Sequence, residues 1–237
     1  PVGEFLTRVH DALGNKAYTT VPTLCWFQST DWFLTWVLCG GGVLFSLLLI
    51  LGFLPALMLG FLWAFYLSIV SAGQTFMNFQ WDVLLLEAGF VAIFFAPLTL
   101  RLGSPRANPP SRAVHFLIAW LLFRLMFQSG MVKLTANDEC WPNLTALLYH
   151  YETQPLPTWT AWYADHLPLW FQKTSVALMF FVELAAPLAL FGPRRLRHAA
   201  CAAIIGLMAL IGATGNYNFF NLLTVVLCVA VLDDALL

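Results

Sequence analysis

Charged side chains inside long apolar stretches are the residues of this sequence best suited to chemistry. Four of them are Glu87, Arg124, Lys133 and Glu183. A charge at the centre of a membrane-spanning helix costs about 2.5–3.5 kcal/mol, so each needs a partner or a water-filled cavity. Arg124 shares a helix face with Gln128, four residues later. A pair between Arg124 and Glu87 or Glu183 would neutralise the bundle interior, and a structural role that fixes helix register is at least as well supported as catalysis.

Lys133 follows Gly130 at the end of one of these stretches. A lysine near a helix end can extend its charged group to water while its methylene groups stay in the apolar region. A lysine that is instead fully buried can act as a base. We favour the first interpretation and predict no catalytic residue, with Lys133 as a base in the alternative.

Three polar residues follow the second apolar stretch. Gln80 and Glu87 are seven residues apart and lie on one face of a helix. Asp82 lies at the predicted start of that helix, where a carboxylate satisfies free backbone N–H groups and complements the helix dipole. We therefore interpret Asp82 as a capping residue.

A second polar cluster combines two phenols, an imidazole and a carboxylate: Tyr149, His150, Tyr151 and Glu152. Such groups can carry out acid–base chemistry. More often they form a hydrogen-bonded turn, and we favour that interpretation. The sequence has no nucleophile elbow, metalloprotease motif, phosphate-binding lysine loop or dinucleotide fingerprint. Its five cysteines lack zinc-site spacing, so neither a metal nor a cofactor is predicted.

Two modifications are compatible with residues outside the apolar stretches. Cys25 and Cys140 fall on the same predicted side of the membrane, where a disulfide would be possible. Asn143 begins an Asn-Leu-Thr glycosylation sequon, which matters only in a eukaryotic host.

The elements that position these residues are membrane-spanning helices. Of the 237 residues, 60% are hydrophobic and 10% charged, and the mean hydropathy is +0.78. Soluble domains have about 45–50% apolar and about 25% charged residues. The net charge of -1 gives no sign of nucleic-acid binding. The sequence thus predicts an all-α polytopic transmembrane bundle of about seven segments: 33–53, 56–73, 83–100, 114–131, 174–191, 199–213 and 219–232.

Residues 132–173 are too polar and too rich in proline and tryptophan to form a single span. We expect an interfacial or re-entrant segment there. Six of the eleven lysines and arginines lie in 101–112 and 193–198, so these are predicted cytoplasmic loops. Residues 1–31 and 132–173 then share the opposite side. We divide the chain into this N-terminal interfacial segment, 1–31, and a transmembrane bundle, 32–237.

One family matches these motifs. The run Phe79–Phe90, FQWDVLLLEAGF, resembles the FQWDxLLLExGF signature of lipase maturation factors, and Leu122–Leu134 and Leu144–Pro157 extend the resemblance. It implies a multi-span protein of the endoplasmic reticulum membrane that assists folding and assembly of secreted dimeric lipases. Bacterial members would lie in the inner membrane with an unknown client. The implied partners are secreted lipases and membrane lipids.

The chain departs from the animal members of this family at both ends. It lacks their first span and their largely soluble C-terminal part, so we expect a fragment of a longer protein. The candidates for a client-binding face, or for its support, are the polar residues named above: Gln80, Asp82, Glu87, Arg124, Gln128, Tyr149, His150, Tyr151, Glu152 and Glu183.

A weaker resemblance supplies the alternative function. Gly130–Leu134, followed by Trp141, resembles the GxxKL…W stretch of vitamin K-dependent carboxylases and their bacterial membrane relatives. In those enzymes the lysine is a base. This resemblance implies a membrane enzyme that uses Lys133 as its base.

Overall fold

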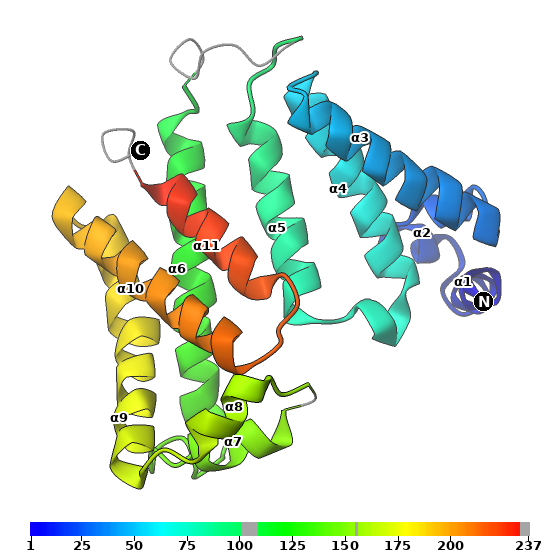
Figure 1. Cartoon of the computed structure of the whole chain (residues 1–237). Helices are drawn as coiled ribbons and strands as arrows, with labels where there is room; N and C mark the ends of the chain where they lie inside the picture. Colours follow the sequence, from blue (N-terminus) through cyan, green and yellow to red (C-terminus); the bar gives the residue numbers. More distant parts are fainter. Residues whose placement is uncertain (101–108, 155, 233–237) are drawn as a thin grey trace. The chain divides into compact units, whose positions relative to one another are not determined.

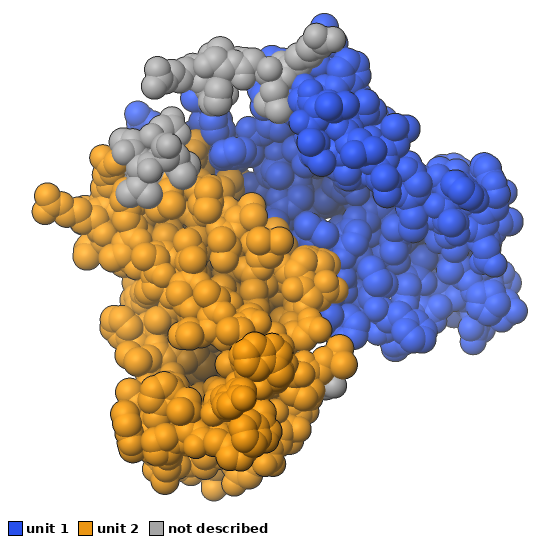
Figure 2. Space-filling view, in the orientation of Figure 1, with its two compact units in different colours: residues 1–114 blue, residues 115–237 orange. Residues whose placement is uncertain are grey.

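The computed structural model describes residues 1–100, 109–154 and 156–232. These residues form helices joined by short turns, and none of them lies in a β-strand. The chain divides into two compact units, Pro1–Val114 and His115–Leu237, which Figure 2 shows in different colours. Each unit is described by itself.

Unit 1 contains the first five labelled helices (Figure 1): α1 (Val2–Leu13), α2 (Ala17–Thr20), α3 (Gly41–Ile50), α4 (Pro55–Ala72) and α5 (Gln80–Phe95). A π-helical segment, Phe33–Gly40, runs directly into α3. The chain reverses between α3 and α4 because Gly52 and Leu54 adopt positive φ angles of 76° and 41°. Pro55 then begins α4, where its missing N–H leaves no hydrogen bond unmade.

The N-terminal segment packs on α4. Leu6 of α1 joins Cys25, Leu38 and Ala72 in a buried hydrophobic cluster. Ser68 of α4 fixes the turn at Leu24–Trp26: the Ser68 hydroxyl accepts a hydrogen bond from the backbone N–H of Leu24 at 3.0 Å. Residues 1–31 thus form part of unit 1, and a separate domain boundary at residue 31 stays a prediction.

Unit 2 is built from the remaining helices: α6 (Arg112–Thr135), which starts at the unit boundary, α7 (Leu147–Thr153), α8 (Trp159–Asp165), α9 (Leu169–Phe180), α10 (Arg194–Thr214) and α11 (Phe220–Val231). Helix α9 continues through a π-helical segment, Phe181–Ala185, into 3₁₀ turns, Ala186–Phe191. Pro187 lies in these turns, and its ring and missing N–H are incompatible with a regular α-helix interior.

Among the residues that the structure describes, five helical segments are long and apolar enough to cross a membrane: Phe33–Ile50, Pro55–Ala72, Arg112–Thr135, Leu169–Phe191 and Arg194–Thr214. A further apolar helix, α11, is shorter. The all-α polytopic membrane bundle predicted from the sequence is therefore confirmed. The stretch 132–173 does not form one span, since it contains the two short helices α7 and α8.

Several predicted boundaries were wrong, among them the start of α9, which lies at Leu169 where Thr174 was expected. The third segment was expected at 83–100, but α5 begins at Gln80 and ends at Phe95, because Ala96 is extended ahead of Pro97. The loop expected at 193–198 is instead the start of α10, which begins at Arg194 directly after Pro193. The other predicted cytoplasmic loop, 101–112, lies mostly outside the described residues.

Candidate functional site

In unit 1, the family motif Phe79–Phe90 forms the first part of α5 and is tied to α4 through Asp82. The Asp82 side chain is 2% exposed. Its Oδ2 accepts a hydrogen bond from the Phe79 N–H at 3.1 Å, and its Oδ1 accepts one from the Tyr66 hydroxyl of α4 at 2.6 Å. Asp82 thus satisfies a free N–H at the helix start from the third helical position, with Phe79 as the N-cap residue, and also links two helices.

The rest of the motif includes a second link to α4 and two polar residues that are less buried than Asp82. The indole N–H of Trp63 on α4 donates to the Leu86 carbonyl of α5 at 3.0 Å, which adds a second link between these helices. Gln80 is exposed and Glu87 is half-buried. Asp82 is therefore the buried anchor among the three polar residues predicted at this helix.

In unit 2, Lys133 of α6 and Glu183 of the π-helical segment form a close ion pair. Lys133 Nζ lies 2.6 Å from Oε1 and 2.7 Å from Oε2 of Glu183, and it also donates to the Ser129 carbonyl at 3.3 Å. The Glu183 side chain is 4% exposed and that of Lys133 is 22% exposed. The Trp141 ring centroid lies 5.5 Å from the same ammonium, within cation–π range.

Lys133 does not extend freely to water as expected, because its ammonium is paired with the buried Glu183 carboxylate, although the lysine side chain remains 22% exposed. Glu183 has Lys133 as a partner, where Arg124 had been considered. Gly130 permits the close approach of the two helices, since an added Cβ would lie 2.6 Å from Leu184 Cδ2 and 3.2 Å from Glu183 Cβ. The pair has the geometry of a register-fixing ion pair.

His150 of α7 meets Tyr217, which lies between α10 and α11. The Tyr217 hydroxyl and His150 Nε2 are 3.2 Å apart, and the two rings are parallel with centroids 6.4 Å apart. Burial lowers the pKa of His150, and the positive charge of Lys133 lowers it further. Burial raises the pKa of Tyr217. Both groups are thus held in their neutral forms near neutral pH.

Gln154, at the end of α7, fixes the same turn. Its Nε2 donates to the Thr214 carbonyl at 2.9 Å. Gly215 permits this contact, because an added Cβ would lie 2.7 Å from Gln154 Oε1 and 2.8 Å from the Tyr217 ring. Tyr149 and Glu152 are exposed, whereas Tyr151 is half-buried. The residues expected in a hydrogen-bonded turn lie instead in the short helix α7, with two of these side chains exposed.

The remaining predicted site residues are not brought together by any of these contacts. Arg124 is half-buried and Gln128 exposed on α6, and Asn143 is exposed in a turn. Cys25 lies in unit 1 and Cys140 in unit 2, both as free thiols, so their pairing stays a prediction. Within the described residues, no group of three or more His, Cys, Asp or Glu side chains has metal-binding geometry.

Sequence reasoning missed Tyr66 and Tyr217, which position these groups, and the buried polar residues Ser68 and Gln172. Tyr66 and Ser68 are polar residues within a span, which is a signal for a buried hydrogen bond. Gln172 is 1% exposed near the start of α9, yet it was taken as part of a polar stretch. The turn containing Tyr217 carried no signal, because its partner is 67 residues earlier in the chain.

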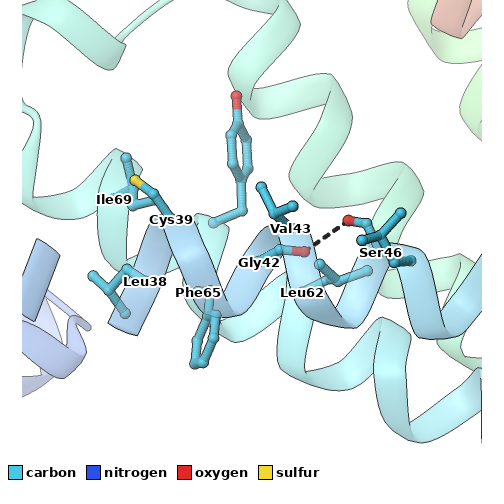
Figure 3. A pocket seen from close by; sticks show the side chains of 10 residues that line it. Leu38, Cys39, Gly42, Val43, Ser46, Leu62, Phe65 and Ile69 are labelled. Carbon is cyan, nitrogen blue, oxygen red and sulfur yellow. Dashed lines mark hydrogen bonds between the residues drawn. The ribbon is translucent and has the colours of Figure 1, made fainter. Parts of the chain in front are cut away.

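A shallow groove of about 380 Å³ lies between α3 with its preceding π-helical segment and α4 (Figure 3). Its walls are mainly aliphatic and aromatic, with Ser46 bonded to the Gly42 carbonyl at 2.8 Å. The Tyr66 hydroxyl at this groove is already engaged by Asp82. The groove therefore offers mainly apolar surface, together with the free thiol of Cys39.

Comparison with known proteins identifies the family. The family model described as the lipase maturation factor transmembrane domain matches residues 1–237. The chain belongs to the lipase maturation factor family. Lipase maturation factor 2 of Xenopus tropicalis is 49% identical over 221 residues, which cover 90% of this chain and 31% of that protein. Human lipase maturation factor 2 is 53% identical over 182 residues, 73% of this chain and 26% of that protein.

Human lipase maturation factor 1 is 36% identical over 228 residues, 94% of this chain and 40% of that protein. The chain therefore spans about a quarter to two fifths of the length of these relatives. No solved structure matches it. The lipase maturation factor motifs predicted from the sequence coincide with the contacts described above: Asp82 in the first motif, Lys133 in the second, and His150 and Gln154 in the third.

Proposed function

We propose that the chain is the membrane-embedded part of a maturation factor that assists folding and assembly of secreted dimeric lipases in the endoplasmic reticulum membrane. Membership of the lipase maturation factor family and the names of the relatives support this function. The membrane-spanning helices agree with a membrane location.

The observation that carries the proposal is the anchoring of the segment 149–154. His150 and Gln154 hold it against residues 214–217, while Tyr149 and Glu152 remain exposed. A fixed backbone with outward-facing aromatic and acidic side chains is suited to binding, because little backbone entropy is lost when a client docks. We assign this segment to the lumenal side and to client contact.

The buried charges act as supports in this proposal. The Lys133–Glu183 pair joins α6 to the helix that continues α9, and α7 packs on α9. Asp82 joins α4 to α5 in unit 1. The first of these contacts engages the amine that the alternative function would need as a free base, since the Lys133 ammonium donates to both oxygens of Glu183. The geometry gives no support to a carboxylase-like enzyme with Lys133 as base.

The test is complementation of cells that lack the endogenous factor. The full-length parent protein, as wild type and as Lys133→Arg, is expressed at matched levels, and secretion of active dimeric lipase is measured. Arginine keeps the positive charge but cannot serve as a base at neutral pH, so we expect both forms to restore secretion. Restoration by wild type alone, at equal protein level, would favour the enzyme. Restoration by neither would overturn the proposed function.

A further inference from the structure

Helix α8 is clamped at both ends to helices that are long enough to span the membrane. At its start, the hydroxyls of Thr158 and Thr160 donate to the Ala213 carbonyl near the end of α10, at 3.0 Å for Thr158. At its end, the buried Gln172 of α9 donates through Nε2 to the Ala164 carbonyl at 2.6 Å. Ala161, on the inner face of α8, is 1% exposed. The helix is thus a fixed element of unit 2 (Figure 1).

The opposite side of α8 carries a continuous aromatic cluster. Trp159 and Tyr163 have ring centroids 6.1 Å apart, and Tyr163 and Trp162 have centroids 5.0 Å apart. The exposed fractions of these three side chains are 78%, 60% and 61%. Trp170, in the first turn of α9, is also exposed. The outer face of α8 thus carries large exposed aromatic side chains, whereas its inner face carries a small buried side chain and is held by hydrogen bonds.

The level of this cluster follows from the clamps. Helix α9 begins at Leu169, four residues after α8 ends, and α10 ends at Thr214, one residue after the Ala213 carbonyl that holds Thr160. The ends of spanning helices lie at the membrane–water boundary, where tryptophan and tyrosine rings are enriched among the headgroups. A helix fixed to two such ends lies at that same depth.

We propose that α8 is a membrane-surface helix whose face of Trp159, Trp162 and Tyr163 lies in phospholipid. This face lies at the boundary between headgroups and acyl chains, in the leaflet where α9 begins and α10 ends. The occupant of this face is lipid because the face continues the lipid-facing surface of two spans. This is separate from client binding, which the proposed function places on α7, at Tyr149 and Glu152. The inference stands on the clamps and exposed rings, whether or not the client is a lipase.

The experiment places a photoreactive side chain at one position of the full-length protein in phosphatidylcholine nanodiscs. The variants are Trp162→p-benzoylphenylalanine on α8, Leu44→p-benzoylphenylalanine on spanning α3 as a lipid-facing control, and Glu152→p-benzoylphenylalanine on α7 as the comparison position. Irradiated protein is analysed by mass spectrometry for phosphatidylcholine adducts. We expect phosphatidylcholine adducts at positions 162 and 44, and no adduct at position 152.

A protein cross-link at position 162 in place of the lipid adduct would overturn the proposal, since another polypeptide would then cover this face. Absence of any adduct at 162, while position 44 reacts, would also overturn it, because the face would then be in water. Adding Gln172→Leu to the 162 variant removes one clamp. If the clamp sets the depth of α8, the lipid adduct at 162 is reduced while the adduct at 44, measured in the same background, is retained.

Discussion

Lys133 Nζ lies 2.6 Å and 2.7 Å from the two carboxylate oxygens of Glu183, across a helix contact that Gly130 makes possible. The two charges therefore form strong, charge-assisted hydrogen bonds with each other, and the Glu183 side chain is only 4% exposed. Removal of either one leaves the other without its counter-charge.

We expect Glu183→Ala to lower the free energy of unfolding by about 1–3 kcal/mol, less than the 3–5 kcal/mol typical of fully buried pairs, because Lys133 retains partial access to solvent. The double variant Lys133→Met with Glu183→Leu should recover part of this loss, since no charge is left unpaired. Unfolding of the purified full-length protein in detergent measures both. Lys173→Met, at an exposed position, is the matched control, and equal losses in all three variants would contradict the pairing.

Asp82 and Tyr66 should be energetically coupled. Tyr66→Phe removes one donor and is expected to cost about 0.5–1.5 kcal/mol, whereas Asp82→Ala leaves two donors without their acceptor and should cost about 2–4 kcal/mol. In the double variant the two losses should not add. A double-mutant cycle on unfolding free energies measures the coupling, and full additivity would show that the 2.6 Å contact contributes nothing.

Gly215 should tolerate no side chain. Its added Cβ would meet both Gln154 Oε1 and the Tyr217 ring below 3.0 Å, so Gly215→Ala must displace the turn that holds α7. We expect a lower unfolding midpoint and faster proteolysis within 149–158. Gly206→Ala on α10 is the control, because an added Cβ there meets nothing within 4 Å and alanine favours a helix by about 1 kcal/mol. Similar behaviour of both variants would contradict the assigned role of Gly215.

Stability should depend on pH through His150. Its pKa is lowered in the folded protein, so below the ordinary value of about 6.5 the unfolded chain takes up a proton more readily than the folded one. The stability contribution of His150 is thus complete above about pH 6.5 and declines as the pH falls through and below that value.

Unfolding midpoints of the wild type between pH 7.5 and pH 5 measure this decline. His150→Gln should flatten the part of the profile just below pH 6.5. A profile that is the same with and without His150 would show that another group is responsible.

The sequence predicted most of the spans because their hydrophobicity depends on local composition alone. Phe33–Ile50, Pro55–Ala72 and Arg112–Thr135 all appear close to their expected positions. It predicted the end of α5 poorly, because residues 96–100 after Phe95 are still largely apolar and only the backbone restriction before Pro97 stops the helix.

Partners of charged residues were harder to predict, since they depend on how helices approach one another. Lys133 and Glu183 were both singled out, but 50 residues separate them and nothing local indicates that they meet. Gly130 was the available signal, because a glycine within a span permits close helix contact. Gln172 was overlooked because its partner carbonyls belong to a short helix, α8, whose existence the sequence did not predict.

The most direct test of client contact compares the exposed side chains of α7 with an exposed side chain in the turn before it. The full-length protein carrying Tyr149→Ala with Glu152→Ala, and a control carrying Glu139→Ala in the preceding turn, are expressed at matched levels in cells lacking the endogenous factor. Secretion of active dimeric lipase is then measured. We predict that the double variant loses most of the secretion while Glu139→Ala keeps it. Full secretion with the double variant, at an unchanged level of the protein, would contradict the assignment of this face to client binding.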